Sequence, residues 1–252
     1  MTPMLPKVSA AKKLKKPVRL SGKIALVTGA SRGIGAAVAK RLAAEGAHVI
    51  ITARTVGGLE EVDDAIRALG GSATLVPLDL RQMDMIDALG GQIYERFGKL
   101  DILVGNAATL GTLSPVAHAS PAEFEDVMTI NLTANYRLIR SCDPLLRAAD
   151  AGRVIMVTSG TAVAPISYWG AYATSKAALE HLTLTYAAEV ASTNIRVNLI
   201  DPGATATNMR AKAFPAEDPR GLPTPESITE WFVRLCEASA PHAQRIVAKA
   251  KV

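Results

Sequence analysis

The sequence has few of the residues that build cross-linked or metal-bound proteins. Among its 252 residues there are only two cysteines, Cys142 and Cys236, which are far apart and lack metal-ligand spacing. Such a pair gives no disulfide framework and fits a reducing compartment, so we expect a cytoplasmic protein. Four histidines are scattered without a Glu or Cys at ligand spacing, so we expect no metal: His48, His118, His181 and His242.

Long hydrophobic runs are also missing. No apolar stretch approaches the roughly 20 residues that span a bilayer, which predicts a soluble protein without a membrane partner. Apolar residues nevertheless make up 49% of the chain. That share is ample for a packed core and excludes a wholly disordered protein. The length suits one large α/β domain.

Acidic residues are absent from the first 20 positions, which carry six basic ones: Lys7, Lys12, Lys13, Lys15, Lys16 and Arg19. Removing these six from the 28 Lys and Arg residues leaves 22 against 23 Asp and Glu, so the remainder is near neutral. We therefore predict a disordered, solubilising tail over residues 1–20 and no nucleic-acid-binding surface on the body. A weak contact of the tail with RNA or lipid is the alternative. No apolar segment follows the lysines, so a secretory signal is not expected.

After the tail, strand-like and helical segments alternate. The predicted strands are Lys23–Thr28, His48–Thr52, Thr74–Leu78, Leu100–Gly105, Arg153–Thr158 and Ile195–Ile200, with Gln244–Ala248 as a last one. The predicted helices are Gly33–Glu45, Leu59–Leu69, Met83–Phe97, Ala122–Leu146 and Ala171–Ala191. Several strands are continuous Val/Ile/Leu runs, typical of parallel strands covered on both faces. The pattern predicts an α/β fold over residues 21–252: a single Rossmann-type, doubly wound parallel sheet of six or seven strands with helices on both faces.

A Pro- and Ala-rich segment over residues 201–225 interrupts this alternation. Long irregular connections inside a compact domain are usually functional, so we expect a substrate loop here. A passive surface loop is the alternative.

The first predicted strand runs into T-G-A-S-R-G-I-G, residues 28–35, and then into a helix. Gly29 permits a sharp turn, while Gly33 and Gly35 allow the helix to begin close to a pyrophosphate. The free N–H groups and positive dipole end of that helix favour phosphate binding. The pattern is typical of a dinucleotide site, and a tight turn without a ligand is the alternative.

Charge indicates which dinucleotide binds. An NAD site usually has a carboxylate at the end of the second strand. Here that strand ends with Ala53 and Arg54, and Arg32 lies within the glycine turn. Two guanidinium groups suit a 2′-phosphate, which predicts NADP(H), unless both arginines simply point to solvent.

Ser159 follows the fifth predicted strand, and Tyr172 begins a Y-A-T-S-K motif that ends at Lys176. Spacing of i and i+4 on a helix places the Tyr and Lys side chains on one face. A free phenol has a pKa of about 10, and an adjacent ammonium favours its ionised form. These residues predict a carbonyl/alcohol oxidoreductase in which Tyr172 is the acid/base and Ser159 holds the substrate oxygen.

With these motifs in place, the sequence resembles the short-chain dehydrogenase/reductase family from about Ser21 to Leu235. Besides the glycine turn and the Ser, Tyr and Lys, the matching segments are P-L-D-L at Asp79, G-N-A-A at Asn106, I-N-L at Asn131 and P-G-A-T-A-T at residues 202–207. The resemblance implies a catalytic set of Asn131, Ser159, Tyr172 and Lys176. It also implies that Asp79 hydrogen-bonds the adenine and that Asn131 kinks its helix to support a proton-relay water. The residues expected to bind NADP(H) are Thr28, Gly29, Ser31, Arg32, Gly33, Ile34, Gly35, Arg54, Asp79, Leu80, Asn106, Ala107, Tyr172, Lys176, Pro202, Gly203, Thr205 and Thr207.

Three departures distinguish the chain from the family pattern. The family's N-N-A-G reads Gly105-Asn106-Ala107-Ala108, and the methyl of Ala108 narrows the expected pocket. The usual D-G-G ending, which helps to build the subunit contact, is missing; the resemblance implies a homo-oligomer, a dimer or a tetramer. Residues 210–219 resemble a bacterial branch of oxidoreductases without an assigned substrate. The substrate is expected to be a small, largely apolar carbonyl or secondary alcohol; a 3-oxoacyl-carrier-protein reductase and a non-catalytic NADP(H) sensor are the alternatives.

Overall fold

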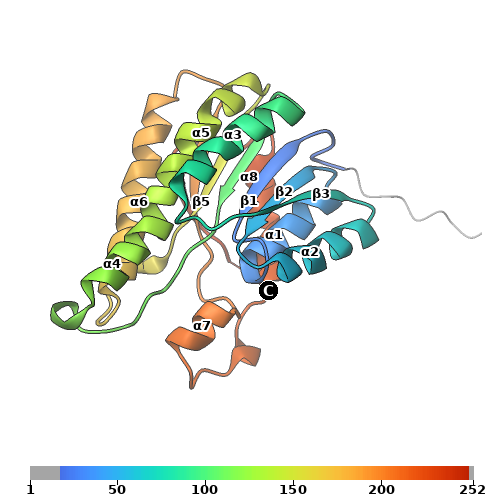
Figure 1. Ribbon diagram of the computed structural model, residues 1–252. Helices are drawn as coiled ribbons and strands as arrows, with labels where there is room; N and C mark the ends of the chain where they lie inside the picture. The colour runs from blue at the N-terminus through green and yellow to red at the C-terminus, as the bar shows by residue number, and fades with distance from the viewer. Residues whose placement is uncertain (1–17, 250–252) are drawn as a thin grey trace, which may run out of the picture.

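Seven parallel strands form one sheet in the order β3-β2-β1-β4-β5-β6-β7 in the computed structural model, which describes residues 18–249 (Figure 1). The strands are β1 Ile24–Thr28, β2 His48–Ala53, β3 Ser72–Pro77, β4 Ile102–Gly105, β5 Arg153–Val157, β6 Arg196–Asp201 and β7 Gln244–Val247. Every residue of β4 and β5 is buried, as their apolar runs require in a doubly covered sheet. The order reverses between β1 and β4, the place where such sheets bind ligands at the carboxyl ends of their strands. The predicted fold class is confirmed.

Helices cover both faces of the sheet. They are α1 Gly33–Ala44, α2 Val56–Ala68, α3 Met83–Phe97, α4 Pro121–Met128, α5 Ala134–Ala148, α6 Gly170–Glu189, α7 Asn208–Ala213 and α8 Thr229–Cys236. Side chains of α1, α2 and α8 share one apolar core, and those of α3, α5 and α6 share the other. Figure 1 shows the same division, with α3, α5 and α6 on one side of the strands and α1 and α2 on the other. No helix among the described residues has the length and apolarity to cross a membrane.

The predicted helix over residues 122–146 is wrong as a single regular helix. The chain forms α4, then a π-helical turn over Thr129–Thr133, and then α5. A π turn inserts one residue into the helical hydrogen-bond pattern, which the apolar spacing does not reveal. Two short helices, α7 and α8, were not predicted. Each is shorter than the window of roughly 11–18 residues over which helical periodicity can be recognised in a sequence.

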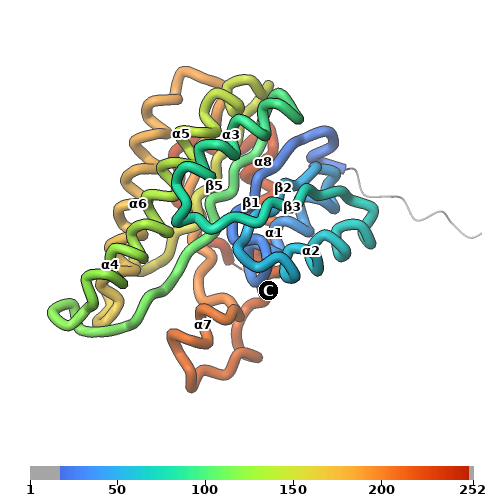
Figure 2. The backbone as a smooth tube through the Cα atoms, in the orientation of Figure 1, coloured from blue at the N-terminus to red at the C-terminus, as the bar shows by residue number. Residues whose placement is uncertain are grey.

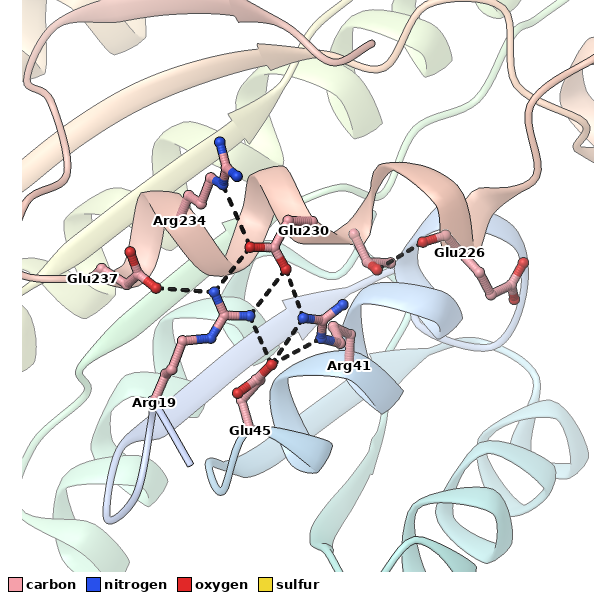
Figure 3. A network of polar contacts seen from close by, with 8 residues as sticks. Arg19, Arg41, Glu45, Glu226, Glu230, Arg234 and Glu237 are labelled. Carbon is pink, nitrogen blue, oxygen red and sulfur yellow. Dashed lines mark hydrogen bonds and ion pairs between the residues drawn. The ribbon is translucent and has the colours of Figure 1, made fainter. Parts of the chain in front are cut away.

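The predicted boundary of the tail at residue 20 is also wrong. Arg19 donates to Glu45 at 2.7 Å and to Glu230 and Glu237 at 2.9 and 3.0 Å, respectively (Figure 3). Leu20 is 1% exposed and belongs to the core. The folded body therefore includes both residues, and the predicted disordered tail over residues 1–17 lies outside the described residues.

The segment over residues 201–225 forms a distinct projection. It contains α7 and a short 3₁₀ turn at Pro219–Gly221, and Figure 2 shows it extending from the body below the ends of the strands. Arg210 holds the segment together through two contacts of 2.6 Å with the carboxylate of Glu217. The predicted irregular loop is thus partly helical, and it borders the site described next.

Candidate active site

The glycine turn is joined to β4 by a compact set of hydrogen bonds. The hydroxyl oxygen of Thr28 accepts from the backbone N–H groups of Asn106 and Ala107, both at 3.0 Å. The Asn106 amide donates in return to the carbonyl of Thr28 at 2.9 Å. Thr28 and Asn106 therefore shape the turn from behind, and the side chain of Asn106 is engaged by the protein itself.

Two glycines of the turn have no room for a side chain. Gly29 has a φ of 65°, and a Cβ atom there would lie 2.9 Å from the Cα of Ala107. A Cβ at Gly35 would lie 2.3 Å from the carbonyl oxygen of Gly29. No side chain caps the first turn of α1, whose N–H groups face this turn, and no acidic residue lies in it. The result is a cradle of backbone N–H groups that suits a phosphate.

A cavity of about 1470 Å³ extends from this cradle along the carboxyl ends of the strands. Most of the predicted cofactor and catalytic residues line it: Gly29, Ser31, Arg32, Gly33, Ile34, Arg54, Asp79, Leu80, Asn106, Ala107, Ser159, Tyr172, Lys176, Pro202, Gly203, Thr205 and Thr207. Thr28, Gly35 and Asn131 do not line it; all three are buried behind its wall. The volume is large enough for a dinucleotide with a small second molecule.

One end of the cavity is basic. Arg32 and Arg54 line it with exposed side chains, as their positions beside the glycine turn and β2 require. Neither forms an ion pair within residues 18–249, whereas Lys40, which also lines the cavity, lies 3.8 Å from Glu226. Two unpaired guanidinium groups beside the phosphate cradle provide hydrogen-bond donors for a further phosphate.

Asp79 lies farther along the same wall and already has a partner. Its carboxylate accepts from the backbone N–H of Arg81 at 3.1 Å and from the Arg81 guanidinium at 3.2 Å. Arg81 also donates to Asp126 at 2.6 Å, which joins this wall to α4. A nucleotide base bound here would contact the Asp79 carboxylate, whose orientation Arg81 already fixes.

Tyr172, Lys176 and Ser159 meet at the other end of the cavity. Tyr172 and Lys176 lie on the first turns of α6 and are 8% and 1% exposed. The Lys176 ammonium lies 5.8 Å from the centre of the Tyr172 ring and donates to the carbonyl of Val157 at 2.7 Å. The predicted i, i+4 arrangement is therefore present, with the lysine tied to the end of β5.

Burial dominates the protonation of this pair. It raises the pKa of Tyr172 to about 12; the Ser159 hydroxyl opposes this rise and the Asp201 carboxylate adds to it. Burial lowers the pKa of Lys176 to about 8, and Glu180 opposes the fall. The pKa of Tyr172 is therefore raised rather than lowered among the protein's own groups, because burial of the phenol is the largest cause.

Asn131 lies inside the π-helical turn and connects three elements. Its amide oxygen accepts from the backbone N–H of Thr109 at 2.8 Å, and its amide nitrogen donates to the Ser175 hydroxyl at 2.9 Å. Ser175 donates in turn to the carbonyl of Tyr172 at 2.7 Å. Asn131 therefore fixes the first turn of α6, on which Tyr172 lies, from a fully buried position.

A residue of α5 explains the glycine at position 105. A Cβ on Gly105 would lie 2.5 Å from the amide oxygen of Asn135, which is buried and has no hydrogen-bond partner. The amide nitrogen of Asn135 donates to the carbonyl of Asn131 at 2.8 Å. The chain therefore has an asparagine at position 135 on α5, and that side chain occupies space which a side chain at position 105 on β4 would need. Sequence reasoning missed Asn135 because its spacing marks no motif.

Aromatic side chains form the wall beside Tyr172. The Trp169 ring meets the Tyr172 ring edge-on at 5.7 Å and the Phe214 ring, from the projecting segment, at 5.8 Å. Ala108, which was predicted to narrow the pocket, lines the same cavity together with Leu110, whereas Tyr168 does not. The reactive end is therefore largely apolar around one hydroxyl-bearing cluster. Within residues 18–249, no three His, Cys, Asp or Glu side chains gather to hold a metal.

Known proteins share this architecture. The profile of the family described as short chain dehydrogenase matches residues 23–218. The uncharacterized oxidoreductase YciK of Escherichia coli (strain K12) is 37% identical over 86% of this chain and 86% of its own. The structure of a short chain dehydrogenase from Pseudomonas syringae has a TM-score of 0.89 and 36% identity, and covers 92% of this chain and 97% of its own. A short chain dehydrogenase from Shigella flexneri 2a str. 301, solved in complex with NADP, has a TM-score of 0.89 and 35% identity, over 92% of this chain and 99% of its own.

Proposed function

The chain belongs to the short chain dehydrogenase family, and we propose that it is an NADP(H)-dependent oxidoreductase that interconverts a carbonyl and a secondary alcohol. The observation that carries the proposal is the convergence of Ser159, Tyr172 and Lys176 at one end of a cavity whose other end is a phosphate cradle. The NADP bound to the Shigella flexneri relative supports the choice of cofactor.

The residues present fit such a cofactor. The backbone of Gly29–Gly35 would hold its pyrophosphate, and Arg32 and Arg54 its 2′-phosphate. Asp79 and Leu80 would flank the adenine, while Asn106, Ala107, Lys176 and the backbone of residues 202–207 would hold the nicotinamide half. The cofactor, when bound, supplies or accepts the hydride.

Tyr172 handles the proton. During reduction its phenol donates to the substrate oxygen, and during oxidation its phenolate accepts the alcohol proton. Ser159 donates a hydrogen bond to the same oxygen and keeps it within reach. Lys176, held near the ring, provides the positive charge that counters burial when the phenolate forms. Asn131 supports this step by holding the turn that bears Tyr172.

The substrate pocket favours a small, largely apolar molecule. Trp169, Phe214, Leu110 and Ala108 surround the place where a carbonyl would meet Tyr172. A bulky charged substrate would lose its hydration there without a matching partner. A 3-oxoacyl-carrier-protein reductase activity is the runner-up within the family, and failure to reduce an acetoacetyl thioester would dismiss it.

We also propose that the protein acts in the cytoplasm as a homo-oligomer joined through α5 and α6. A hollow of about 500 Å³ lies on that face, lined by Leu132, Thr133, Tyr136, Ala178, His181, Leu182 and Thr185. The Tyr136 side chain is 48% exposed there. An apolar face of this kind is typical of a surface covered by a second copy.

The test is turnover of a carbonyl panel that includes alicyclic, aryl and 3-oxoacyl thioester substrates. NADPH is expected to be oxidised in step with formation of one alcohol, whereas NADH should be a poor substitute. Tight NADPH binding with no turnover of any member would favour an NADP(H) sensor instead. Absence of binding to either nucleotide would overturn the proposal.

A further inference from the structure

The last strand of the sheet carries a charged side chain to the floor of the active site. Arg245, in β7, donates through Nε to the Glu180 carboxylate at 2.8 Å. Its Nη2 donates to the carbonyl of Ser159 at 3.1 Å and to the Asp201 carboxylate at 3.0 Å. One guanidinium thus joins the carboxyl ends of β5 and β6 to α6. Its side chain is 24% exposed, and those of Glu180 and Asp201 are 12% and 9% exposed.

Each partner of Arg245 is connected to the catalytic end of the cavity. Ser159 bears the hydroxyl proposed to hold the substrate oxygen. The second oxygen of Asp201 accepts from the backbone N–H of Gly203 at 3.0 Å, where the chain turns with a φ of 65° into the projecting segment. Glu180 lies one turn after Lys176 on α6 and accepts from the Thr158 hydroxyl at 2.7 Å. The guanidinium therefore fixes backbone on two sides of the reactive site.

The network also balances charge, because Arg245 pairs with the carboxylates of Glu180 and Asp201. Two carboxylates with little access to water are costly unless a cation pairs with them. The negative charge of Asp201 raises the pKa of Tyr172 and thus opposes the phenolate. Arg245 supplies a compensating positive charge, and its planar fork reaches three partners that a lysine could not hold together.

We propose that Arg245 is a positioning residue for the reaction: it holds the main chain of Ser159 and the Asp201–Gly203 turn, and it neutralises two carboxylates behind Tyr172. This inference rests on the proposed function. Among the described residues, Lys176 on the same helix lies beside the Tyr172 ring, and the Asp201 charge on β6 acts on it. Arg245 on β7 joins Asp201 to Glu180 on α6. The Arg210–Glu217 pair on the projecting segment lies against Phe214 on the far side of Trp169. Removal of Arg245 leaves two carboxylates against one ammonium, so the phenolate forms at higher pH.

The first test is the pH profile of alcohol oxidation. In Arg245→Met, the rising limb of kcat should move up by at least one pH unit, which is about a tenfold loss of kcat at neutral pH. Arg245→Met combined with Asp201→Asn should recover most of this shift, because one excess carboxylate is gone. Arg245→Lys should leave the rising limb of kcat at its wild-type pH but raise KM. Lysine retains the positive charge but lacks the planar guanidinium that contacts three partners. Arg196→Met, at the amino end of β6 and away from the carboxyl ends that line the cavity, is the matched control. An unchanged limb in Arg245→Met would overturn the proposal.

The second test does not require turnover, so it separates this inference from the proposed function. Arg245→Met and Arg245→Lys should both weaken NADPH binding about tenfold, because the Asp201–Gly203 turn would be displaced from the nicotinamide half. Both should leave the binding of 2′,5′-ADP, which lacks that half, within about twofold. Equal losses for the two ligands, or none, would contradict the inference. If the two variants show this pattern but the wild-type protein reduces no carbonyl, the proposed reaction alone is refuted.

Discussion

At the scale of single residues, Tyr172, the proposed acid/base, is subject to opposing demands. Its burial excludes water from the reacting atoms, and the same burial raises its pKa to about 12. A phenol of such a pKa stays protonated near neutrality, so it is available as a proton donor, but it is a weak acid and its phenolate is scarce. The charges around it therefore set how easily its proton can be transferred in either direction of the proposed reaction.

The phenol is predicted to be indispensable for turnover. Tyr172→Phe keeps the ring and its packing against Trp169 but removes the transferable proton. We expect kcat to fall by about 10²- to 10⁴-fold. NADPH affinity should stay within about threefold by fluorescence titration. Tyr168→Phe, which alters an exposed ring outside the cavity, is the matched control and should keep its kcat. A variant at Tyr172 with near-normal kcat would assign the proton to another group.

The nucleotide preference is predicted to depend on Arg54. Loss of a charge-assisted contact to a phosphate costs about 1.5–3 kcal/mol, or roughly 10- to 100-fold in affinity. Arg54→Ala should weaken NADPH binding by that factor and leave NADH binding nearly unchanged. Arg67→Ala is the control, because Arg67 lies on the adjacent α2 and pairs with Asp63 at 2.7 Å. Equal losses for both nucleotides would show that Arg54 does not read the 2′-phosphate.

At the scale of secondary-structure elements, local patterns predicted those that carry the site. The strand before Thr28, the glycine turn and the start of the helix at Tyr172 follow from runs of neighbouring residues, and the structure has each of them. The family resemblance implied a kinked helix at Asn131, and the structure has a π-helical turn there. The apolar spacing alone did not indicate it, because one inserted residue leaves that spacing almost unchanged. Arg245 was missed because a single arginine in a short strand has no local signal; its partners lie 44 to 86 residues away.

A second element-level feature is the ionic network that fastens the chain before β1 to α1 and α8. Arg19 and Arg41 share the carboxylates of Glu45 and Glu230, and Arg234 approaches Glu230 from α8 itself (Figure 3). Hydrogen bonds from Arg19, above all, lower the pKa of both carboxyls to about 2. Their stabilising charge is therefore complete above the ordinary glutamate pKa, and it is lost as the pH falls through about 2.

Glu230→Gln is predicted to lower stability in a pH-dependent way. Loss of a shared carboxylate costs about 2 kcal/mol, which lowers Tm by roughly 4–8 °C at neutral pH in a domain of this size. The difference from the wild-type protein should narrow below pH 4.5 and close near pH 2, as the wild-type carboxyl becomes protonated. Thermal melts from pH 2 to 8 measure it, with Glu60→Gln on the exposed face of α2 as the control. A difference that stays constant with pH would mean that the substitution acts through packing.

At the scale of the whole molecule, the candidate active site lies at the carboxyl ends of the strands, and the outer face of α5 and α6 bears a separate hollow. The carboxyl ends of β1, β4, β5 and β6 all open into the same cavity, as the parallel order requires. The sequence predicted a doubly wound parallel sheet with the site at the carboxyl ends of its strands, but not the order of the strands. It did not predict how the chain before Leu20 is fastened, because Arg19 meets partners more than 200 residues away.

Self-association is predicted to use the face formed by α5 and α6. Tyr136→Glu together with Leu182→Glu should place two unpaired charges in the hollow between those helices and convert the oligomer to a monomer. Light scattering coupled to size-exclusion chromatography measures the change. Tyr94→Glu, at a 65% exposed ring on α3, should leave the mass unchanged. An oligomer that survives the double substitution would mean that another face joins the copies.

The central claim is tested most directly by following the hydride itself. NADPH carrying deuterium at the transferable position of the nicotinamide would be incubated with the protein and a carbonyl substrate from the panel. The account predicts one deuterium on the carbinol carbon for each NADPH oxidised, and transfer slower by about 10²- to 10⁴-fold with Tyr172→Phe under the same conditions. Alcohol product without deuterium, or undiminished transfer in the Tyr172→Phe protein, would contradict it.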